Sequence, residues 1–442
     1  MITDTLLIFV QQTSPRVEYI FSTILNAIGI HSHKFTIDKE YFLYNIGAKI
    51  NYSANSISAN ECWIKPVELL FEKNIKPQII KCFNWKDTKA FFQSDGSDYP
   101  FDIFAASFYL LSRYEEYLVH TKDTYGRYAH ENSLSFREDF LDQPLVNIWI
   151  TDFEKMIRNK FPELPENTAH FHFLPTYDID IAWSYLNKGI VRNAAGIIKE
   201  IATGKWELVK QRLAVLSNKI KDPFDNYQWL DELHKSYELK PIYFFLLAQS
   251  SKKYDKNIPP NNYALRQLIK EHDKHYSVGI HPSWQSGDKH HLLKEEKELL
   301  KNITDKKVNK SRQHYIRMDL PNTYRRLIDA GITEDYSMGY GSINGFRASH
   351  CLPYQWYDLQ KETTTPLIIY PFCYMDANSI FEQHNTPEEA LNELLKYCRI
   401  TKEVKGYLIT IFHNHLLTHQ LKQIGWQRMY KNFLGSLIEG EK

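Results

Sequence analysis

Aspartate and histidine side chains follow short apolar runs in the second part of the chain. The segment 176–180 has the sequence TYDID, so Asp178 and Asp180 come at the end of one run. His281 and His413 end two other runs in the same way, and Asp376 follows a further one. Zinc and similar ions bind Asp oxygens and His nitrogens, and a catalytic ion keeps one position open for water. A second carboxylate can act as general base and a histidine as general acid.

These side chains share one position in a repeating pattern, in which short β-rich runs alternate with longer helical stretches. The runs cover residues 170–174, 242–248, 276–280, 367–372 and 407–412. Strands that alternate with helices predict βαβ units and a parallel sheet. In a (β/α) barrel the carboxyl ends of all strands open on one face, where catalytic residues gather. The pattern therefore predicts that residues far apart in the sequence meet at one site.

The first part of the chain has a different organisation, with short strands, polar loops and one strong helix. Leu6–Val10 is the expected first strand, and helical spacing of apolar residues predicts a helix over residues 101–119. The chain becomes polar and proline-rich around 162–167, which is typical of a boundary. We therefore predict an N-terminal α/β domain of unknown role over 1–160 and a larger domain over 168–442.

Composition and charge argue against a nucleic-acid-binding or membrane-spanning protein. The 442 residues include 54 Lys and Arg against 53 Asp and Glu, a net charge of +1, so bulk charge predicts no nucleic-acid partner. No apolar run approaches the roughly 20 residues that a bilayer span needs, so none is expected. Asp4 stands early and the apolar stretch after it is short, unlike a signal peptide, so we expect a cytoplasmic protein. The five cysteines lack CxxC spacing and are expected to be buried thiols.

Four short motifs resemble those of the polysaccharide deacetylases of the NodB-homology type, carbohydrate esterase family 4. TYDID at 176–180 resembles the first motif, Thr-Phe-Asp-Asp, and GIHPS at 279–283 resembles the second, in which a His opens a metal-binding segment. GFRA at 345–348 resembles the motif that carries an Arg, and LITIFH at 408–413 resembles the last motif, a strand that ends in a catalytic His. The motifs follow one another in the family's order.

The resemblance extends beyond the motifs to a bacterial subgroup with an uncharacterised N-terminal domain. SRYEEY at 112–117 and YGR at 125–127 carry this part of the resemblance. It implies an α/β fold in which an irregular (β/α) barrel of the NodB type follows the smaller N-terminal domain. It also implies a divalent metal, with zinc the preferred ion, and a carbohydrate substrate that loses an acetyl group.

The resemblance implies a role for each residue of the site. Asp178 takes the role of catalytic base and His413 that of catalytic acid. Arg347, from the third motif, is the catalytic arginine and could orient the base by a bidentate pair. Asp180 and His281 are implied as metal ligands.

The sequence departs from the family pattern at two points. Ile179 separates two aspartates that are adjacent in the family, so the two carboxylates could exchange roles or both bind the metal. Gln285 stands where the family has its second metal-binding His, and Gln is a poor zinc ligand. His314 is the best replacement as third ligand. His290 and His291 are alternatives in an expected exposed loop.

Three functions remain open from the sequence. The first is a metal-dependent hydrolase that removes an acetyl group from an amino sugar or a glycan precursor. The second is an inactive relative that binds a glycan or a partner in surface-polysaccharide metabolism. The third, a barrel glycoside hydrolase, would need two carboxylates about 5–9.5 Å apart, such as Asp178 and Asp376, and would leave the histidines unexplained. Trp284, Tyr340 and Trp356 could stack on a sugar or fill a core. The sequence leaves the oligomeric state open.

Overall fold

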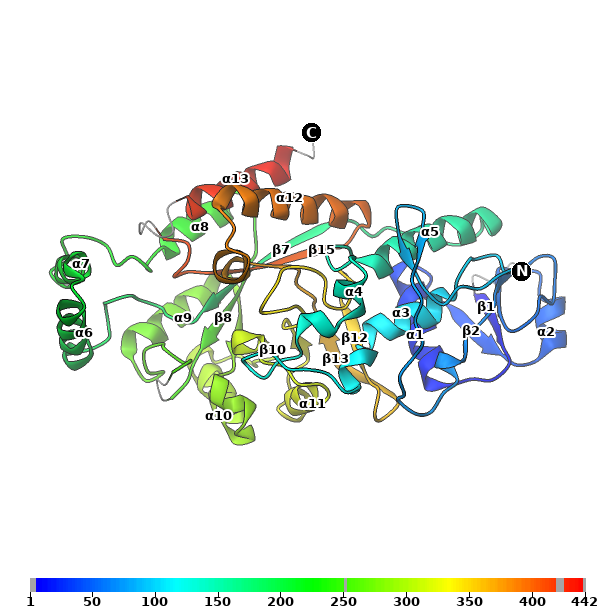
Figure 1. The fold of residues 1–442 in the computed structure, drawn as a ribbon, viewed down its shortest axis with the longest axis horizontal. Coiled ribbons are helices and arrows are strands. Elements are labelled where there is room, and N and C mark those ends of the chain that lie inside the picture. Colours follow the sequence, from blue (N-terminus) through cyan, green and yellow to red (C-terminus); the bar gives the residue numbers. More distant parts are fainter. Residues whose placement is uncertain (1–4, 250–252, 419–424, 440–442) are drawn as a thin grey trace.

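The computed structural model describes residues 5–249, 253–418 and 425–439 (Figure 1). The chain begins with a four-stranded parallel sheet in the order β2-β1-β3-β4. Its strands are β1 (Leu6–Val10), β2 (His33–Thr36), β3 (Lys49–Tyr52) and β4 (Cys62–Ile64). The helices of this part are α1 (Pro15–Ala27), α2 (Lys39–Tyr44), α3 (Ile103–Leu111), α4 (Leu134–Arg137) and α5 (Leu145–Lys160). A small antiparallel pair, β5 (Phe83–Trp85) and β6 (Thr88–Ala90), lies between β4 and α3 in the sequence.

The predicted helix over 101–119 is shorter in the structure. α3 ends at Leu111, and a separate 3₁₀ turn covers Tyr114–Tyr117. Between them Arg113 takes a left-handed backbone conformation, with φ of 54°, which stops an α-helix. The Arg113 side chain makes buried ion pairs with Glu115 and Glu116, and these contacts hold the break in place.

A second, nine-stranded sheet forms the larger part of the molecule, in the order β12-β13-β11-β10-β9-β8-β7-β15-β14. The strands are β7 (His172–Ile179), β8 (Ile242–Leu246), β9 (Ser277–His281), β10 (Lys310–Ser311), β11 (Glu334–Asp335), β12 (Tyr354–Asp358), β13 (Thr363–Ile369), β14 (Tyr374–Met375) and β15 (Tyr407–His413). All neighbours are parallel except β12 and β13. The chain is thus mixed α/β, with a parallel sheet where βαβ units were predicted.

The helices of this part pack around the large sheet. They are α6 (Ile190–Ala202), α7 (Trp206–Leu216), α8 (Tyr227–Ser236), α9 (Tyr263–His275), α10 (His290–Thr304), α11 (Asn322–Asp329), α12 (Pro387–Glu403) and α13 (Trp426–Glu439). In Figure 1, α12 and α13 lie above the sheet and α10 and α11 below it, while α6 and α7 stand apart at one end. The five cysteines are free thiols, and four of them are buried.

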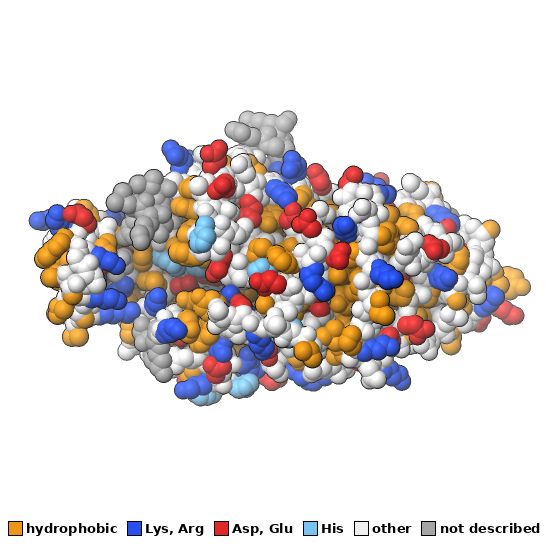
Figure 2. Space-filling view, in the orientation of Figure 1, with side chains coloured by type: hydrophobic (Ala, Val, Ile, Leu, Met, Phe, Trp, Pro, Cys, Tyr) orange, Lys and Arg blue, Asp and Glu red, His pale blue; other side chains and the backbone are white. Residues whose placement is uncertain are grey.

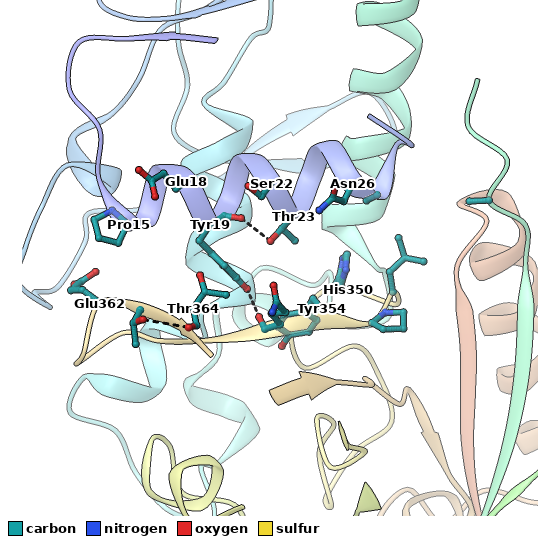
Figure 3. A pocket seen from close by; sticks show the side chains of 16 residues that line it. Pro15, Glu18, Tyr19, Ser22, Thr23, Asn26, His350, Tyr354, Glu362 and Thr364 are labelled. Atoms are coloured by element: carbon teal, nitrogen blue, oxygen red, sulfur yellow. Dashed lines mark hydrogen bonds between the residues drawn. The ribbon is translucent and has the colours of Figure 1, made fainter. Parts of the chain in front are cut away.

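Over the residues that the structure describes, the sheet of the expected irregular (β/α) barrel is not closed. In the described part of the chain β12 and β14 are the two edges of the sheet and do not pair with each other. Helix α1 packs against the β12–β13 hairpin, where the Tyr19 hydroxyl donates to the Gln355 carbonyl at 2.9 Å (Figure 3). Arg16 of the same helix pairs with Glu362. A helix that covers a sheet edge removes the need for another strand there.

The apolar core is continuous between the two predicted domains. It contains β1 and β3 of the first sheet and β7, β8 and β15 of the second in one cluster of buried side chains. Tyr19 of α1 lies against Tyr357 of β12 with ring centroids 4.8 Å apart, so aromatic contacts cross between the halves. The boundary near residues 162–167 stays a prediction. No helix in the described part of the chain has the length and hydrophobicity that a bilayer crossing requires.

Candidate functional site

The carboxyl ends of adjacent parallel strands carry the chemistry. Asp178 lies on β7 near its end and Asp180 directly after it, while His281 ends β9 and His413 ends β15. β15 pairs with β7 so that His413 is opposite Asp178. In a sheet with this topology, ligands bind at the carboxyl edge of the strands, and side chains from distant parts of the chain meet there.

Three of these side chains form a group that could hold a metal ion. The group comprises Asp180, His281 and His314, and one ligand atom from each lies within 4.8 Å of the others. His281 Nε2 is 3.1 Å from Asp180 Oδ1, and His314 Nε2 is 3.5 Å from Asp180 Oδ2. Ligand atoms at 2.0–2.2 Å from one tetrahedral ion are separated by roughly 3.3–3.6 Å. The observed spacing is therefore close to that of ligands around one ion.

Hydrogen bonds fix which ring nitrogen of each histidine faces the group. His281 Nδ1 lies 2.7 Å from the Arg312 carbonyl oxygen, which can only accept, so Nδ1 carries a proton. His314 Nδ1 lies 3.0 Å from Asp255 Oδ1, a carboxylate oxygen that also accepts. In the neutral form both rings therefore present an Nε2 lone pair to Asp180. This is the orientation that partners beyond the ligands impose on metal-binding histidines.

Asp180 is the centre of the group and is not fully satisfied by the protein. Its Oδ1 atom is buried and accepts no well-directed hydrogen bond from the described residues. Burial by itself raises the pKa of this carboxyl, but the charge of His314 and hydrogen bonds from His281 and His314 lower the pKa well below its usual value. The same contacts raise the pKa of His314 to about 9 against the effect of burial. A buried carboxylate oxygen without a well-directed donor, close to two histidine nitrogens, is a donor set that fits a divalent metal.

Asp178 is held by an arginine at the side of the group. Arg312 Nη1 donates to Asp178 Oδ1 at 3.0 Å and to Thr176 Oγ1 at 2.6 Å, and Arg312 Nε donates to the Tyr336 carbonyl. Both Asp178 and Arg312 are buried. The second carboxylate oxygen, Oδ2, lies 3.7 Å from His281 Nε2 and faces the metal-type group. The ion pair thus fixes one oxygen and leaves the other directed at the site.

His413 stands on the opposite side and has its own carboxylate partner. Its Nδ1 lies 2.6 Å from Asp376 Oδ1, its backbone N–H donates to Asp376 Oδ2, and its Nε2 lies 3.6 Å from Asp180 Oδ2. Burial opposes the charged ring, but the charge and hydrogen bond of Asp376, with the charges of Asp180 and Asp178, raise the pKa of His413 to about 10. His413 is therefore a proton donor at neutral pH.

The structure places the other predicted residues elsewhere. Arg347 does not line the site, because its guanidinium makes a bidentate pair with Glu116 at 2.6 and 2.9 Å. Arg312, and not Arg347, donates to Asp178. Gln285 lies outside the group and donates to Asp255 at 3.4 Å. The alternatives His290 and His291 are exposed at the start of α10.

A cavity of about 250 Å³ opens over the site. Asp178, Asp180, His281, His314 and His413 line it, and so do two residues of the N-terminal part, Tyr125 and Arg127. The Arg127 guanidinium bonds the Tyr315 carbonyl at 2.7 Å, which ties the loop of 121–130 to the site wall. The N-terminal part therefore contributes directly to the site.

The three aromatic residues predicted as a sugar platform have different environments. Tyr340 and Trp356 are buried in the core. Trp284 is half-buried and stacks on Tyr254 at 4.1 Å, and Tyr125 and Tyr315 lie around this pair. An aromatic wall from four separate loops thus lies beside the cavity.

Sequence reasoning assigned no role in the site to Asp255, Tyr125, Arg127 or Arg312. Asp255 follows β8 in a loop, and no apolar run directly precedes it. Tyr125 and Arg127 were noted only as part of a resemblance. Arg312 stands next but one to His314, and its position after β10 is the signal that could have placed it at the site.

Comparisons with family models and with curated proteins do not assign a function to the chain. Residues 6–162 match a model described as a family of unknown function, DUF7033. No curated protein matches the sequence.

Polysaccharide deacetylases are among the solved structures that the chain matches. A Mycobacterium smegmatis protein named as a polysaccharide deacetylase is 11% identical with a TM-score of 0.39, over 61% of this chain and 84% of that one. The polysaccharide deacetylase of Bacillus cereus is 11% identical with a TM-score of 0.30, over 61% and 88%. A 4-alpha-glucanotransferase of Thermococcus litoralis is 10% identical with a TM-score of 0.37, over 61% and 38%. Likeness at this level does not carry a functional argument, which rests on the site itself.

Proposed function

We propose that this protein is a metal-dependent hydrolase that removes an acetyl group from an amino sugar or a glycan precursor. The observation that carries the proposal is one group of possible metal ligands, Asp180, His281 and His314, between two proton-transfer side chains. The motif resemblance supplies the substrate class. A divalent metal such as zinc, when bound by these three residues, would lower the pKa of water and polarise a carbonyl group.

The residues of the chain have separable tasks in this proposal. Asp178, whose Oδ1 is held by Arg312, has Oδ2 free to accept the proton of the attacking water. His413, charged through Asp376, donates a proton to the leaving nitrogen or oxygen. Each proton transfer of this kind contributes about 10²–10⁴-fold to rate. The aromatic wall beside the cavity is positioned to contact a sugar ring.

The glycoside hydrolase alternative would need Asp376 as its second carboxylate at the cavity. Asp376 is fully buried and both of its oxygens bond His413, so it does not face Asp178 across the cavity. Substitution of the family His by Gln285, the reason to consider an inactive relative, is offset by His314, which reaches the same group.

The test combines metal content with acetyl release. Protein purified without chelator is expected to hold close to one divalent ion per chain by elemental mass spectrometry. The same protein should release acetate from acetylated amino sugars, free or nucleotide-linked, and lose this activity after chelation. A chain that binds no metal in excess zinc would contradict the proposal and favour an inactive relative that binds a glycan.

A further inference from the structure

The helical hairpin formed by α6 and α7 projects from one end of the molecule, opposite the N-terminal sheet (Figure 1). It is inserted between β7 and β8, directly after the strand that delivers Asp178 and Asp180. The two helices pack on each other, and the base of the hairpin bonds the loop after β8, where Asn257 accepts from the Ala182 N–H and donates to the carbonyls of Ile179 and Leu246 at the strand ends. The hairpin therefore belongs to the side of the molecule that carries the site.

The hairpin exposes large apolar side chains to solvent. Ile190 is 89% exposed, Ile198 68% and Trp206 57%. Other exposed apolar residues of the hairpin and its edge are Val191, Ile201, Leu208, Leu213, Leu216 and Ile220. In Figure 2 hydrophobic and basic side chains lie together at this end of the molecule. An apolar surface of this extent marks an interaction site.

The hairpin buries a polar contact between its helices as well as Val209 and Val215 of α7. Arg212 of α7 is buried against α6, where it pairs with Glu200 and donates to Asn193 Oδ1 at 2.8 Å. Gly196 makes room for this guanidinium, because a Cβ there would lie 2.6 Å from Arg212 Nη2. The polar contacts hold the helices together, so the isoleucines on the outside are not needed for that packing.

Positive charge surrounds the apolar surface. Residues 188–221 contain eight lysines and arginines against two glutamates, whereas the whole chain is nearly neutral at +1. The segment therefore carries a net charge of +6 and the remainder of the chain is negative. Exposed Lys199 and Lys205 lie next to the exposed Ile198 and Trp206 in the sequence. Apolar residues with Trp beside a basic polar face are typical of helices that lie in a membrane interface.

Hydrogen bonds fix the base of the hairpin to the loops around the site. Asp222 accepts from the backbone N–H groups of Ser184 and Tyr185, and Arg192 donates to the Lys256 carbonyl next to Asp255. A surface that holds the hairpin would therefore also hold the site edge in a defined position.

We propose that the α6–α7 hairpin binds the surface of an anionic lipid bilayer, with its apolar side chains at the level of the headgroups and its lysines on the lipid phosphates. Charge complementarity favours an anionic bilayer as the partner. The basic side chains are attracted to the lipid phosphates, and the apolar side chains gain from burial at the level of the headgroups. The proposal does not depend on the acetyl-removal function.

Vesicle flotation of the full-length protein tests the proposal. The protein is expected to float with phosphatidylcholine–phosphatidylglycerol vesicles and much less with phosphatidylcholine alone. Salt that shortens the Debye length to about 3 Å should reduce binding. The double variant Ile198→Ser, Trp206→Ser and the double variant Lys199→Glu, Lys205→Glu should each lower the partition coefficient about 10-fold or more.

Matched substitutions outside the hairpin provide the control. Ile46 is 84% exposed in the N-terminal part, and Lys39 at the start of α2 is also exposed. Ile46→Ser and Lys39→Glu should leave flotation unchanged. The proposal is overturned if wild-type protein does not float with anionic vesicles, or if the hairpin variants float as well as the controls. It is also overturned if light scattering shows a dimer that the hairpin variants dissociate, while no form of the protein floats with lipid.

Discussion

The molecule contains two buried charge clusters that differ in how many of their carboxylate oxygens accept hydrogen bonds. In the structural cluster, Arg347 and Arg113 both donate to Glu116, and Arg113 also pairs with Glu115. Both Glu116 oxygens accept from arginine, and the second Glu115 oxygen accepts from the Leu134 N–H at 2.9 Å. In the site cluster, Asp180 Oδ1 has no well-directed donor among the described residues, and the Nε2 atoms of two histidines lie close to this carboxylate.

The difference distinguishes a charge cluster that joins two parts of the fold from one that could hold a ligand. The structural cluster joins the N-terminal part to the large sheet and closes on itself, whereas the site cluster borders a cavity. Buried polar groups cost free energy when left unpaired, so an unpaired group that persists beside a cavity indicates a missing partner. Substitutions in the site cluster should change metal content and turnover, whereas substitutions in the structural cluster should change stability.

The largest expected effect is on metal content. Asp180→Ala removes the carboxylate that both His281 and His314 face. We expect bound metal to fall from about one ion per chain to near zero, with the fold retained, by elemental mass spectrometry and circular dichroism. Glu116→Gln is the control and should keep its metal. Asp180→Ala protein with full metal content would show that the ion, if any, binds elsewhere.

The next effect is on turnover alone. Asp178→Asn keeps the size of the side chain but removes the proton acceptor. Acetate release should fall by about 10²–10⁴-fold while metal content is unchanged. Substitution of the arginine in the structural cluster, Arg347→Lys, should affect kcat far less, because Arg347 does not line the cavity. An Asp178→Asn enzyme with wild-type kcat would remove Asp178 from the role of base.

The structural cluster should respond in stability instead. Glu116→Gln leaves two buried arginines without their shared charge. Breaking a buried ion pair of this kind lowers the free energy of unfolding by about 3–5 kcal/mol. Chemical denaturation would measure the loss. A change below the error of that measurement would mean that Glu116 does not hold the two parts together.

A smaller effect is expected one contact away from the proposed metal. Asp255 orients His314 through the bond to its Nδ1 at 3.0 Å. Loss of such a partner weakens metal affinity by about 10–100-fold. Asp255→Asn should therefore raise the zinc dissociation constant by that factor in a competition titration with a chelator dye. An equal loss from Asn257→Asp, a neighbouring polar residue outside the group, would point to loop distortion instead.

The smallest effect is a pH dependence that distinguishes the clusters. Burial raises the pKa of Glu116, but the charges of Arg347 and Arg113 and their hydrogen bonds lower the pKa to about 2. A carboxyl with a depressed folded-state pKa stabilises the fold above its unfolded pKa, near 4.3, and loses that contribution as the pH falls towards 2. The stability difference between wild type and Glu116→Gln should be largest at neutral pH and shrink through this window in acid denaturation. A difference that is constant from neutral pH to pH 2 would contradict the low pKa.

Arg312 and Arg347 show why part of the site could not be predicted. Either guanidinium could orient a carboxylate, and the residues next to them in the sequence do not say which one. Their partners are far away in the sequence: Asp178 lies 134 residues from Arg312, and Glu116 lies 231 residues from Arg347. Only the packed structure decides which carboxylate each guanidinium meets. The short motif around Arg347 favoured a catalytic role for this residue, but its guanidinium pairs with Glu116 of the N-terminal part.

The sequence by itself determined which residues end the strands and what chemistry they carry. Apolar periodicity over a few residues predicted β1, β8, β9 and β15 and the positions of Asp178, Asp180, His281 and His413, because a strand and its end are local properties of the chain. Tertiary structure decided that His314 joins Asp180, that α1 covers a sheet edge in place of barrel closure, and that Tyr125 and Arg127 reach the cavity. Those outcomes depend on contacts between segments more than a hundred residues apart, and short-range patterns do not encode such contacts.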